Sequence, residues 1–123
     1  MLSHHQIQPM LAITRLENAK RFYGEQLGLR LVAEDQFALS YELAGAQLRL
    51  SKVAALTPQP FTAFGWRVPD VRAGARSLAA RGVCFERFEG MDQDADGVWT
   101  PPGGTGGVCW FKDPDGNLLS LSD

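Results

Sequence analysis

Hydrophobic residues in this chain recur in two similar series, each with a short apolar run followed by an amphipathic helical pattern. The run Leu11-Ala12-Ile13-Thr14 precedes a helix predicted over residues 17–27, in which one face is apolar. The run Trp66-Arg67-Val68-Pro69 occupies the same place in the second half and precedes a helix predicted over residues 72–81. Both helical patterns end at a glycine, and both halves close on similar leucine-rich strands. The chain therefore contains a degenerate internal repeat.

Shorter apolar and alternating segments after each helix predict strands, at 29–34, 37–43 and 47–51 in the first half and at 83–88, 108–111 and 119–122 in the second. Turn-forming residues at 43–46 and 113–117 predict tight turns between strands. Each half thus has the order β-α-β-β-β. We predict an α+β fold in a single domain over residues 1–123, with one module at about 6–52 and a second at about 61–123.

Alternation along the strands assigns their side chains to two faces. The last strand of each half carries leucine at alternate positions, which we place beneath the helix. Arg49 and Ser120 lie between those leucines and therefore point to the opposite face, and the same alternation places Arg67 there. Phe64 and Trp66 belong under the helix.

Composition and charge exclude several classes of protein. Lys and Arg number 12 against 14 Asp and Glu, so the net charge is −2 and a nucleic-acid partner is disfavoured. No apolar run approaches the roughly 20 residues that a membrane span needs, and no leader pattern opens the chain. Cys84 and Cys109 form no CxxC pair and lie in apolar runs, which favours buried thiols in a cytoplasmic protein.

Specific motifs within the repeat resemble a known family. They are Arg21-Phe22-Tyr23 with Leu27-Gly28-Leu29 in the first half, and Trp110-Phe111-Lys112 before Asp113-Pro114-Asp115-Gly116-Asn117 in the second. Together with the order of elements, they resemble the vicinal oxygen chelate superfamily, which includes glyoxalase I, extradiol dioxygenases, and bleomycin- and fosfomycin-resistance proteins. The resemblance extends from about Gln8 to Ser122. It implies a cup-shaped mixed sheet, built by the two modules, with the helices outside.

The resemblance also implies where a divalent metal would be held, from the first and last strand of each module. Those positions fall on Gln8, Ala63, Arg49 and Ser120. Only Gln8 could coordinate, because Ala63 has no donor atom, Arg49 carries a permanent positive charge and Ser120 is a weak neutral ligand. Since a hard cation needs several oxygen or nitrogen ligands, we expect no metal and no cofactor.

Two other groups of possible ligands favour a structural interpretation. His4 and His5 read as a polar terminal segment, although His5 could approach Gln8 in an alternative metal site. The segment 92–97, Asp-Gln-Asp-Ala-Asp-Gly, resembles the start of a calcium loop, but Gly103 stands where a bidentate glutamate is required. We interpret it as a solvated acidic loop, in a stretch that resembles the variable lid of the family's second module.

Aromatic residues are numerous, and we assign most of them to the core, including Tyr41 and Phe61. Trp99 follows a loop and is a candidate wall for a flat ligand, with Trp110 as a second contact. Arg49 and Arg67 would grip an anionic or carbonyl-bearing ligand, pair with an acid such as Glu42, or extend their charged ends into water.

These observations favour a metal-free protein that binds a small hydrophobic or aromatic molecule, with antibiotic sequestration as one role and no catalytic residue. The expected ligand-binding residues are Gln8, Arg49, Arg67, Trp99, Trp110 and Ser120. The resemblance implies a homodimer. The alternative is a glyoxalase-type lyase or a dioxygenase that uses Zn, Ni, Mn or Fe, held by Gln8, His5 and Glu42 or an acid of the 90–97 loop. Metal-free catalysis, in which Arg49 or Glu42 stabilises an enolate, is a third possibility.

Overall fold

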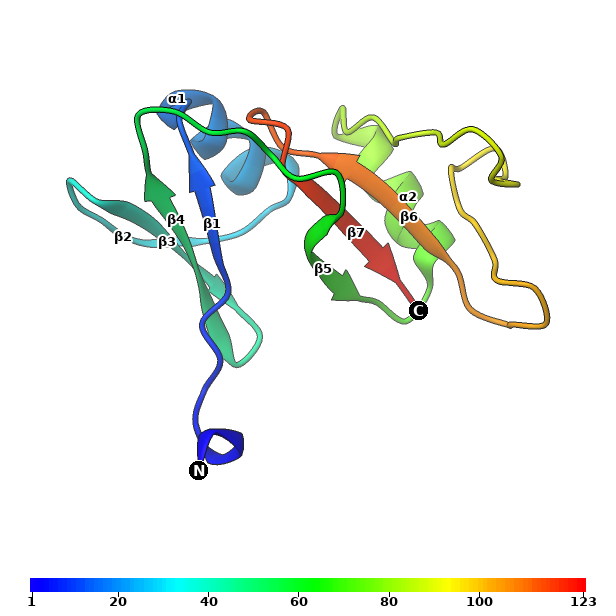
Figure 1. Cartoon of the computed structure of the whole chain (residues 1–123), viewed down its shortest axis with the longest axis horizontal. Helices are drawn as coiled ribbons and strands as arrows, with labels where there is room; N and C mark the ends of the chain where they lie inside the picture. Colours follow the sequence, from blue (N-terminus) through cyan, green and yellow to red (C-terminus); the bar gives the residue numbers. More distant parts are fainter. The chain divides into compact units, whose positions relative to one another are not determined.

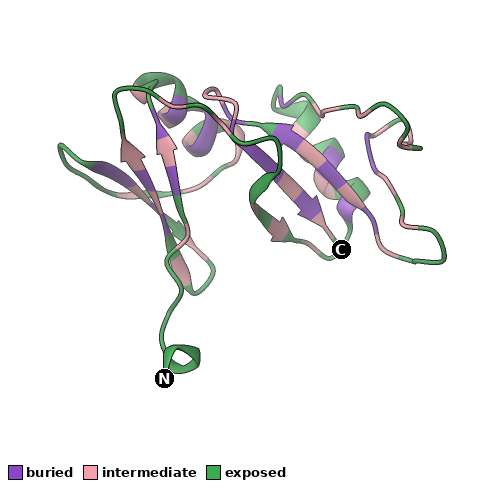
Figure 2. Cartoon of the chain, viewed as in Figure 1, coloured by how far each residue is buried: buried purple, intermediate pink, exposed green.

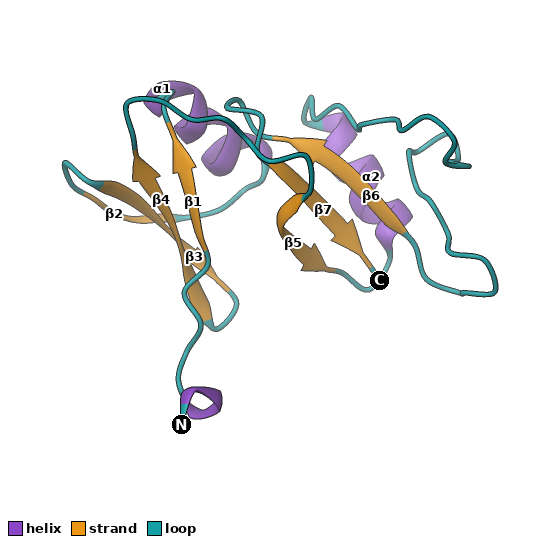
Figure 3. Cartoon of the chain, viewed as in Figure 1, coloured by secondary structure: helices purple, strands orange, loops and turns teal.

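The computed structural model describes all residues 1–123 and divides into two compact units, Met1–Thr57 and Pro58–Asp123 (Figure 1). Each unit contains one small mixed sheet and one main helical segment (Figure 3). The α+β fold class predicted from the sequence is therefore confirmed. None of the helices has the length and apolar character needed to cross a membrane.

The first unit has a four-stranded sheet in the order β1-β4-β3-β2, in which β1 is parallel to β4 and the other pairs are antiparallel. Its elements are η1 (Leu2–His4), β1 (Met10–Ile13), α1 (Leu16–Ala19), η2 (Lys20–Gln26), β2 (Leu31–Glu34), β3 (Ala38–Leu43) and β4 (Ala46–Lys52). The second unit has a three-stranded sheet in the order β5-β7-β6, with β5 parallel to β7 and β6 antiparallel to it. Its elements are β5 (Thr62–Arg67), α2 (Val71–Ala80), β6 (Val108–Lys112) and β7 (Leu118–Ser122).

Both helices form close to the predicted positions. The first begins at Leu16, one residue before the predicted start, and changes from α-helix to π-helix at Lys20. The second begins at Val71, where the Asp70 side chain accepts a hydrogen bond from the backbone N–H of Ala73 at 3.1 Å. This N-cap satisfies one of the amides that a helix start leaves without a partner.

The core of each unit lies between its helix and one face of its sheet. In the first unit, Leu48 and Leu50 are fully buried while Arg49 between them is half-buried, as alternation predicts. The Tyr23 ring of the helix lies 6.0 Å from the Tyr41 ring of β3. Figure 2 shows the resulting alternation of buried and partly exposed positions along the strands.

In the second unit, α2 packs against β6 and β7. Phe111, Leu119 and Cys109 are buried on that face, and burial raises the pKa of the Cys109 thiol to about 11. Cys84, which was predicted to be buried, is exposed. Cys84 follows the end of α2, and its neighbour Val83 is buried in its place.

The strand predicted over residues 83–88 does not form. Only Phe85 makes a backbone bridge to Phe111 of β6, and the amide of Glu86 donates to the carbonyl of Trp110. Beyond that point the Gln93 side chain accepts from the Phe88 amide at 2.8 Å. A side chain five residues further along the chain thus bonds the Phe88 backbone, and the apolar run is an irregular segment along the edge of β6.

The turn between β6 and β7 forms as predicted and is closed by a buried carboxylate. Asp113 accepts hydrogen bonds from the amides of Asp115 and Asn117 and from the Asn117 side chain, at 2.8–3.0 Å. Gly116 has φ 90°, which a glycine adopts without a steric cost. The turn therefore fixes the register of the two strands that carry Trp110 and Ser120.

Candidate functional site

The open face of the second sheet, opposite α2, carries three of the ligand-binding residues predicted from the sequence, which are Trp99, Trp110 and Ser120. Trp110 of β6 pairs with Ser120 of β7, and Ser120 pairs with Gly65 of β5. Residues paired across strands share a face, so Trp110, Ser120 and Gly65 form one row across the sheet. Trp99 lies beside this row, because it forms a backbone bridge to Val108 of β6, two residues before Trp110. We call this surface the aromatic face.

Three aromatic rings line the aromatic face. The Trp99 and Trp110 ring centroids are 6.4 Å apart and inclined at 39°, and the Phe88 ring meets Trp110 edge-on at 5.4 Å. All three side chains are half-buried. Aromatic rings in such contacts hold one another in place, and they expose flat apolar surface to solvent. The arrangement can stack a planar molecule.

The Trp110 indole is fixed by a residue that the sequence did not indicate. Its N–H donates to the hydroxyl of Thr62 at 3.2 Å. Alternation with Phe64 would place Thr62 under the helix, but the β5-β7 register shifts between these two residues. Ala63 is the extra residue in this bulge, so it does not take the regular first-strand position expected for it. A register irregularity of this kind has no signal in the sequence.

Gly65 leaves room for the Ser120 side chain. A Cβ atom on Gly65 would overlap the Ser120 hydroxyl and would lie 2.9 Å from the Ser120 carbonyl oxygen. The hydroxyl therefore occupies the space above a glycine, beside the Trp110 position. Ser120 is half-buried there and supplies a polar group at the position paired with Trp110.

Arg67 ends β5 opposite Ser122, on the same face as Ser120, and it is exposed. No ion pair holds its guanidinium, although its charge contributes to lowering the pKa of Asp123. Phe64 and Trp66 lie on the helix side as predicted, where the Trp66 ring is 6.4 Å from Phe111 and nearly parallel to it. Phe61, which was assigned to the core, is 61% exposed.

The first unit holds the two other predicted ligand residues. Gln8 precedes β1 and is exposed. Arg49 lies on the open face of β4 between Met10 and Ser40, which are its partners on the two neighbouring strands. Glu42, suggested as a partner of Arg49, instead pairs with Arg30 at 2.9 Å.

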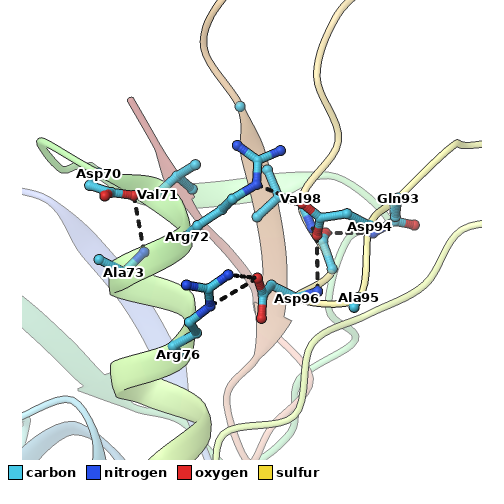
Figure 4. Close-up of polar contacts among 12 residues, drawn as sticks. Asp70, Val71, Arg72, Ala73, Arg76, Gln93, Asp94, Ala95, Asp96 and Val98 are labelled. Carbon is cyan, nitrogen blue, oxygen red and sulfur yellow. Dashed lines mark hydrogen bonds and ion pairs between the residues drawn. The ribbon is translucent and has the colours of Figure 1, made fainter.

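The acidic segment predicted to be a solvated loop is packed against the helix. Asp94 and Asp96 form ion pairs with Arg72 and Arg76 of α2 (Figure 4). Burial raises the pKa of Asp94, but the Val98 amide and the Arg72 guanidinium outweigh this effect, so the pKa lies below its ordinary value of 3.8. These carboxylates are neutralised by arginine.

Neither unit offers a set of ligands for a divalent metal. The positions implied by the resemblance provide one exposed amide (Gln8), a cation (Arg49), a methyl group in a bulge (Ala63) and a neutral hydroxyl (Ser120). No three His, Cys, Asp or Glu side chains are grouped so that they could hold a metal ion. The residues present do not fit such a metal.

A family model described as the Glyoxalase/Bleomycin resistance protein/Dioxygenase superfamily matches residues 4–121. A comparison with curated proteins gives no match.

Several solved structures are similar over nearly the whole chain. A member of the same superfamily from Sphaerobacter thermophilus DSM 20745 is 22% identical, with a TM-score of 0.74, and the match covers 99% of this chain and 98% of that one. A lactoylglutathione lyase from Agrobacterium tumefaciens is 17% identical, with a TM-score of 0.72 and coverage of 97% and 92%. A glyoxalase/bleomycin resistance protein from Streptomyces sp. CB03234 is 25% identical, with a TM-score of 0.65 and coverage of 94% and 97%. The first two likenesses show the fold alone.

Proposed function

Since this chain belongs to the glyoxalase/bleomycin resistance protein/dioxygenase superfamily, we propose that it binds a small planar hydrophobic or aromatic molecule without a metal ion. The observation that carries this proposal is the pair of half-buried tryptophans, Trp99 and Trp110, on the open face of the second sheet. Sequestration of the bound molecule, such as an antibiotic, is the role that follows, because no bond need be broken.

The physical basis is apolar burial directed by a few polar groups. Covering the two indole faces removes apolar area from water, and each Å² so buried contributes about 25 cal/mol. The Ser120 hydroxyl lies in the same strand row, and the unpaired guanidinium of Arg67 lies at the end of β5. These two groups would orient a ligand that carries a carbonyl or an acidic substituent. Gln8 and Arg49, in the first unit, stay predictions from the sequence as ligand-binding residues.

A glyoxalase-type or dioxygenase reaction is the competing function, and a lyase is among the similar structures. The donor atoms argue against it for this chain, because a cation beside Arg49 would meet like charge and Ser120 would supply only a neutral oxygen. Elemental analysis of untagged protein decides between them. We expect less than about 0.1 equivalent of Zn, Ni, Mn or Fe per chain. One equivalent of metal per chain, with a lyase or dioxygenase activity that disappears when a chelator removes the metal, would overturn the binding proposal.

The binding site itself is tested with two molecules that share a skeleton and differ in flatness, 2-naphthol and its saturated form decahydro-2-naphthol. The side-chain N–H signals of the three tryptophans are assigned in a ¹⁵N-labelled sample by Trp→Phe substitution. Addition of 2-naphthol should shift the signals of Trp99 and Trp110 and leave that of Trp66 in place, because Trp66 lies on the helix side. The saturated molecule should bind at least several-fold more weakly, since it cannot stack.

Removing the Trp99 ring, the proposed wall of the site, should lower the affinity for 2-naphthol. Trp99→Ala should weaken 2-naphthol binding about tenfold, which is the size of one aromatic stacking contact. The matched control is Phe37→Ala, which removes another exposed aromatic side chain, 63% exposed, in the first unit. Equal affinities for the wild type and Trp99→Ala would contradict the assignment of the site.

The homodimer implied by the family resemblance is part of the same proposal. Light scattering of the purified protein should give about twice the mass of one 13.5 kDa chain. A monomer mass at the concentration of the binding experiments would remove the dimer from the proposal and leave the aromatic face as its basis.

A further inference from the structure

Trp99 lies at the end of a small hairpin that is closed by its own polar groups. Gln93 and Trp99 form an antiparallel bridge, and the Asp94 amide donates to the Val98 carbonyl at 2.9 Å. The Asp94 side chain accepts from the amides of Asp96 and Val98 at 2.9 and 3.0 Å. The segment from 93 to 99, which we call the Trp99 hairpin, is therefore ordered as one piece.

The Trp99 hairpin is bonded to the sheet through Trp99, and to residues 86–88 through the Gln93 side chain and the Arg87 guanidinium. Trp99 exchanges two backbone hydrogen bonds of 2.9 Å with Val108, at the edge of β6. Val98, the neighbouring residue, is 1% exposed and points to the opposite side. A Cβ atom on Gly107 would lie 2.6 Å from the Val98 side chain and 3.1 Å from that of Val71, so the absence of a side chain lets these two valines approach. One apolar anchor of the hairpin is thus at the start of α2, and a second is Phe85, on which the backbone of Gly97 packs.

Two arginines of α2 also hold the hairpin. Arg72 Nε lies 2.7 Å from Asp94 Oδ2, and Arg76 Nη2 lies 2.9 Å from Asp96 Oδ2 (Figure 4). Residues four apart lie on one face of a helix, so both guanidinium groups point toward the hairpin. In Figure 4 dashed lines connect both arginines of the helix to the turn that leads back to Val98. The hairpin therefore has one apolar and two ionic attachments to α2, all on the side away from the Trp99 ring.

We infer that Arg72 and Arg76 are positioning residues for the aromatic face: by holding Asp94 and Asp96 they fix the Trp99 ring against Trp110 for a planar ligand. The inference rests on the proposed function of the Trp99 and Trp110 pair. The arginines do not touch the ligand. Val98 and Trp99 are neighbours, so their side chains point to opposite sides of the hairpin. Holding the side that faces α2 therefore also fixes the orientation of the Trp99 ring on the other side.

The test compares a charge-removing variant with a charge-keeping one. Arg72→Gln/Arg76→Gln should bind 2-naphthol roughly threefold to tenfold more weakly, as expected for the loss of two partly exposed ion pairs. Arg72→Lys/Arg76→Lys keeps the charges and should restore affinity to within about twofold of the wild type. Since 2-naphthol is neutral, the change in net charge has no direct effect on its binding.

The matched control is Arg21→Gln/Arg30→Gln, which removes two exposed arginines and the Arg30–Glu42 ion pair from the first unit. It should bind 2-naphthol like the wild type. If this control weakens binding as much as Arg72→Gln/Arg76→Gln, loss of charge in general is the cause and the inference is wrong. If the Gln variant binds like the wild type, the inference is also wrong.

A readout without ligand separates this inference from the proposed function. In the Gln variant, the Trp99 indole signal should shift and the Trp99 and Val108 amides should exchange with solvent faster, while the Trp66 signal stays in place. If the wild type fails to bind 2-naphthol, the proposed function fails, and these signals still decide the inference. If the double variant does not fold, Asp96→Asn provides the second test, because the Asp96 carboxylate is bonded only to Arg76; unchanged Trp99 signals there would overturn the inference.

Discussion

Contacts of individual atoms set the positions of the side chains on the aromatic face. The Trp110 indole is oriented by one hydroxyl, that of Thr62, at 3.2 Å. The Ser120 side chain lies where a Cβ of Gly65 would be. Polar groups on this face are therefore placed by close contacts and not by strand alternation alone, and small changes in side-chain volume should have measurable effects.

Gly65→Ala should lower the free energy of unfolding by about 1–3 kcal/mol, because the added methyl group meets the Ser120 hydroxyl and carbonyl. Urea unfolding followed by circular dichroism measures the loss. Gly24→Ala is the matched control, since a Cβ atom there meets nothing within 4 Å and alanine is a better helix former. It should be at least as stable as the wild type. Equal stability of the two variants would contradict the contact.

Trp66→Ala should lower the free energy of unfolding by about 3 kcal/mol, because the ring packs on Phe64 at 4.6 Å and on the fully buried Phe111. Trp99→Ala, on the open face, should cost about 1 kcal/mol or less. Thermal and urea unfolding of both variants test the difference. A larger loss for Trp99→Ala would mean that Trp99 belongs to the core.

At the scale of elements, turns and caps connect the pieces that carry the site. The β6-β7 turn aligns Trp110 with Ser120, and the start of α2 is capped from two directions. Asp70 caps the helix from the preceding residue, while the Asp123 side chain accepts from the amides of Val71 and Gly107 at 2.9 and 2.8 Å. The Asp123 carboxylate thus joins the last residue of the chain to the start of α2 and to the segment before β6.

Asp113→Ala should lower the free energy of unfolding by about 2–3 kcal/mol, since three donors in a buried turn lose their acceptor. The urea midpoint of unfolding measures this loss, and amide exchange at Trp110 and Ser120 should become faster because the register loses its closing turn. The control is Asp92→Ala, at an exposed position in the acidic segment, which should change the midpoint little. A stable Asp113→Ala protein with unchanged exchange would contradict the role of the turn.

At the scale of the whole molecule, ionised carboxylates stabilise both units. Hydrogen bonds from Phe37 and Ala38 lower the pKa of Asp35, and hydrogen bonds from Val71 and Gly107 lower that of Asp123. Ion pairs, led by the one with Lys20, lower the pKa of Glu34. The proton is therefore bound less tightly in the folded state than in the unfolded state at each of these groups.

The stability should accordingly be lost in acid. With folded pKa values below the ordinary 3.8 of Asp and 4.5 of Glu, the carboxylates contribute fully above those values, and the contribution disappears as the pH falls through the lower folded pKa. The urea midpoint should be constant from pH 7 to 6 and clearly lower at pH 3. In Asp123→Asn the midpoint should fall less between pH 7 and pH 3. A midpoint that rises toward pH 3 would contradict the sign of these shifts.

The order of elements in the first half and the buried faces of the strands follow from the sequence alone, because periodicity and turn chemistry are local properties. Helix α2 and the burial of Leu48 and Leu119 on one side of each sheet were predictable in this way. The likeness of the motifs to the family was also visible in the residues.

Contacts between distant residues decided the rest. The Thr62 hydroxyl reaches Trp110 only because β5 shifts register at Ala63, and the 83–88 segment meets β6 only through a bridge at Phe85 and one hydrogen bond from Glu86. The acidic loop is packed on α2 because two arginines one helical turn apart meet two aspartates from another part of the chain. Such pairings depend on where the folded chain brings side chains together, which no pattern of neighbouring residues encodes.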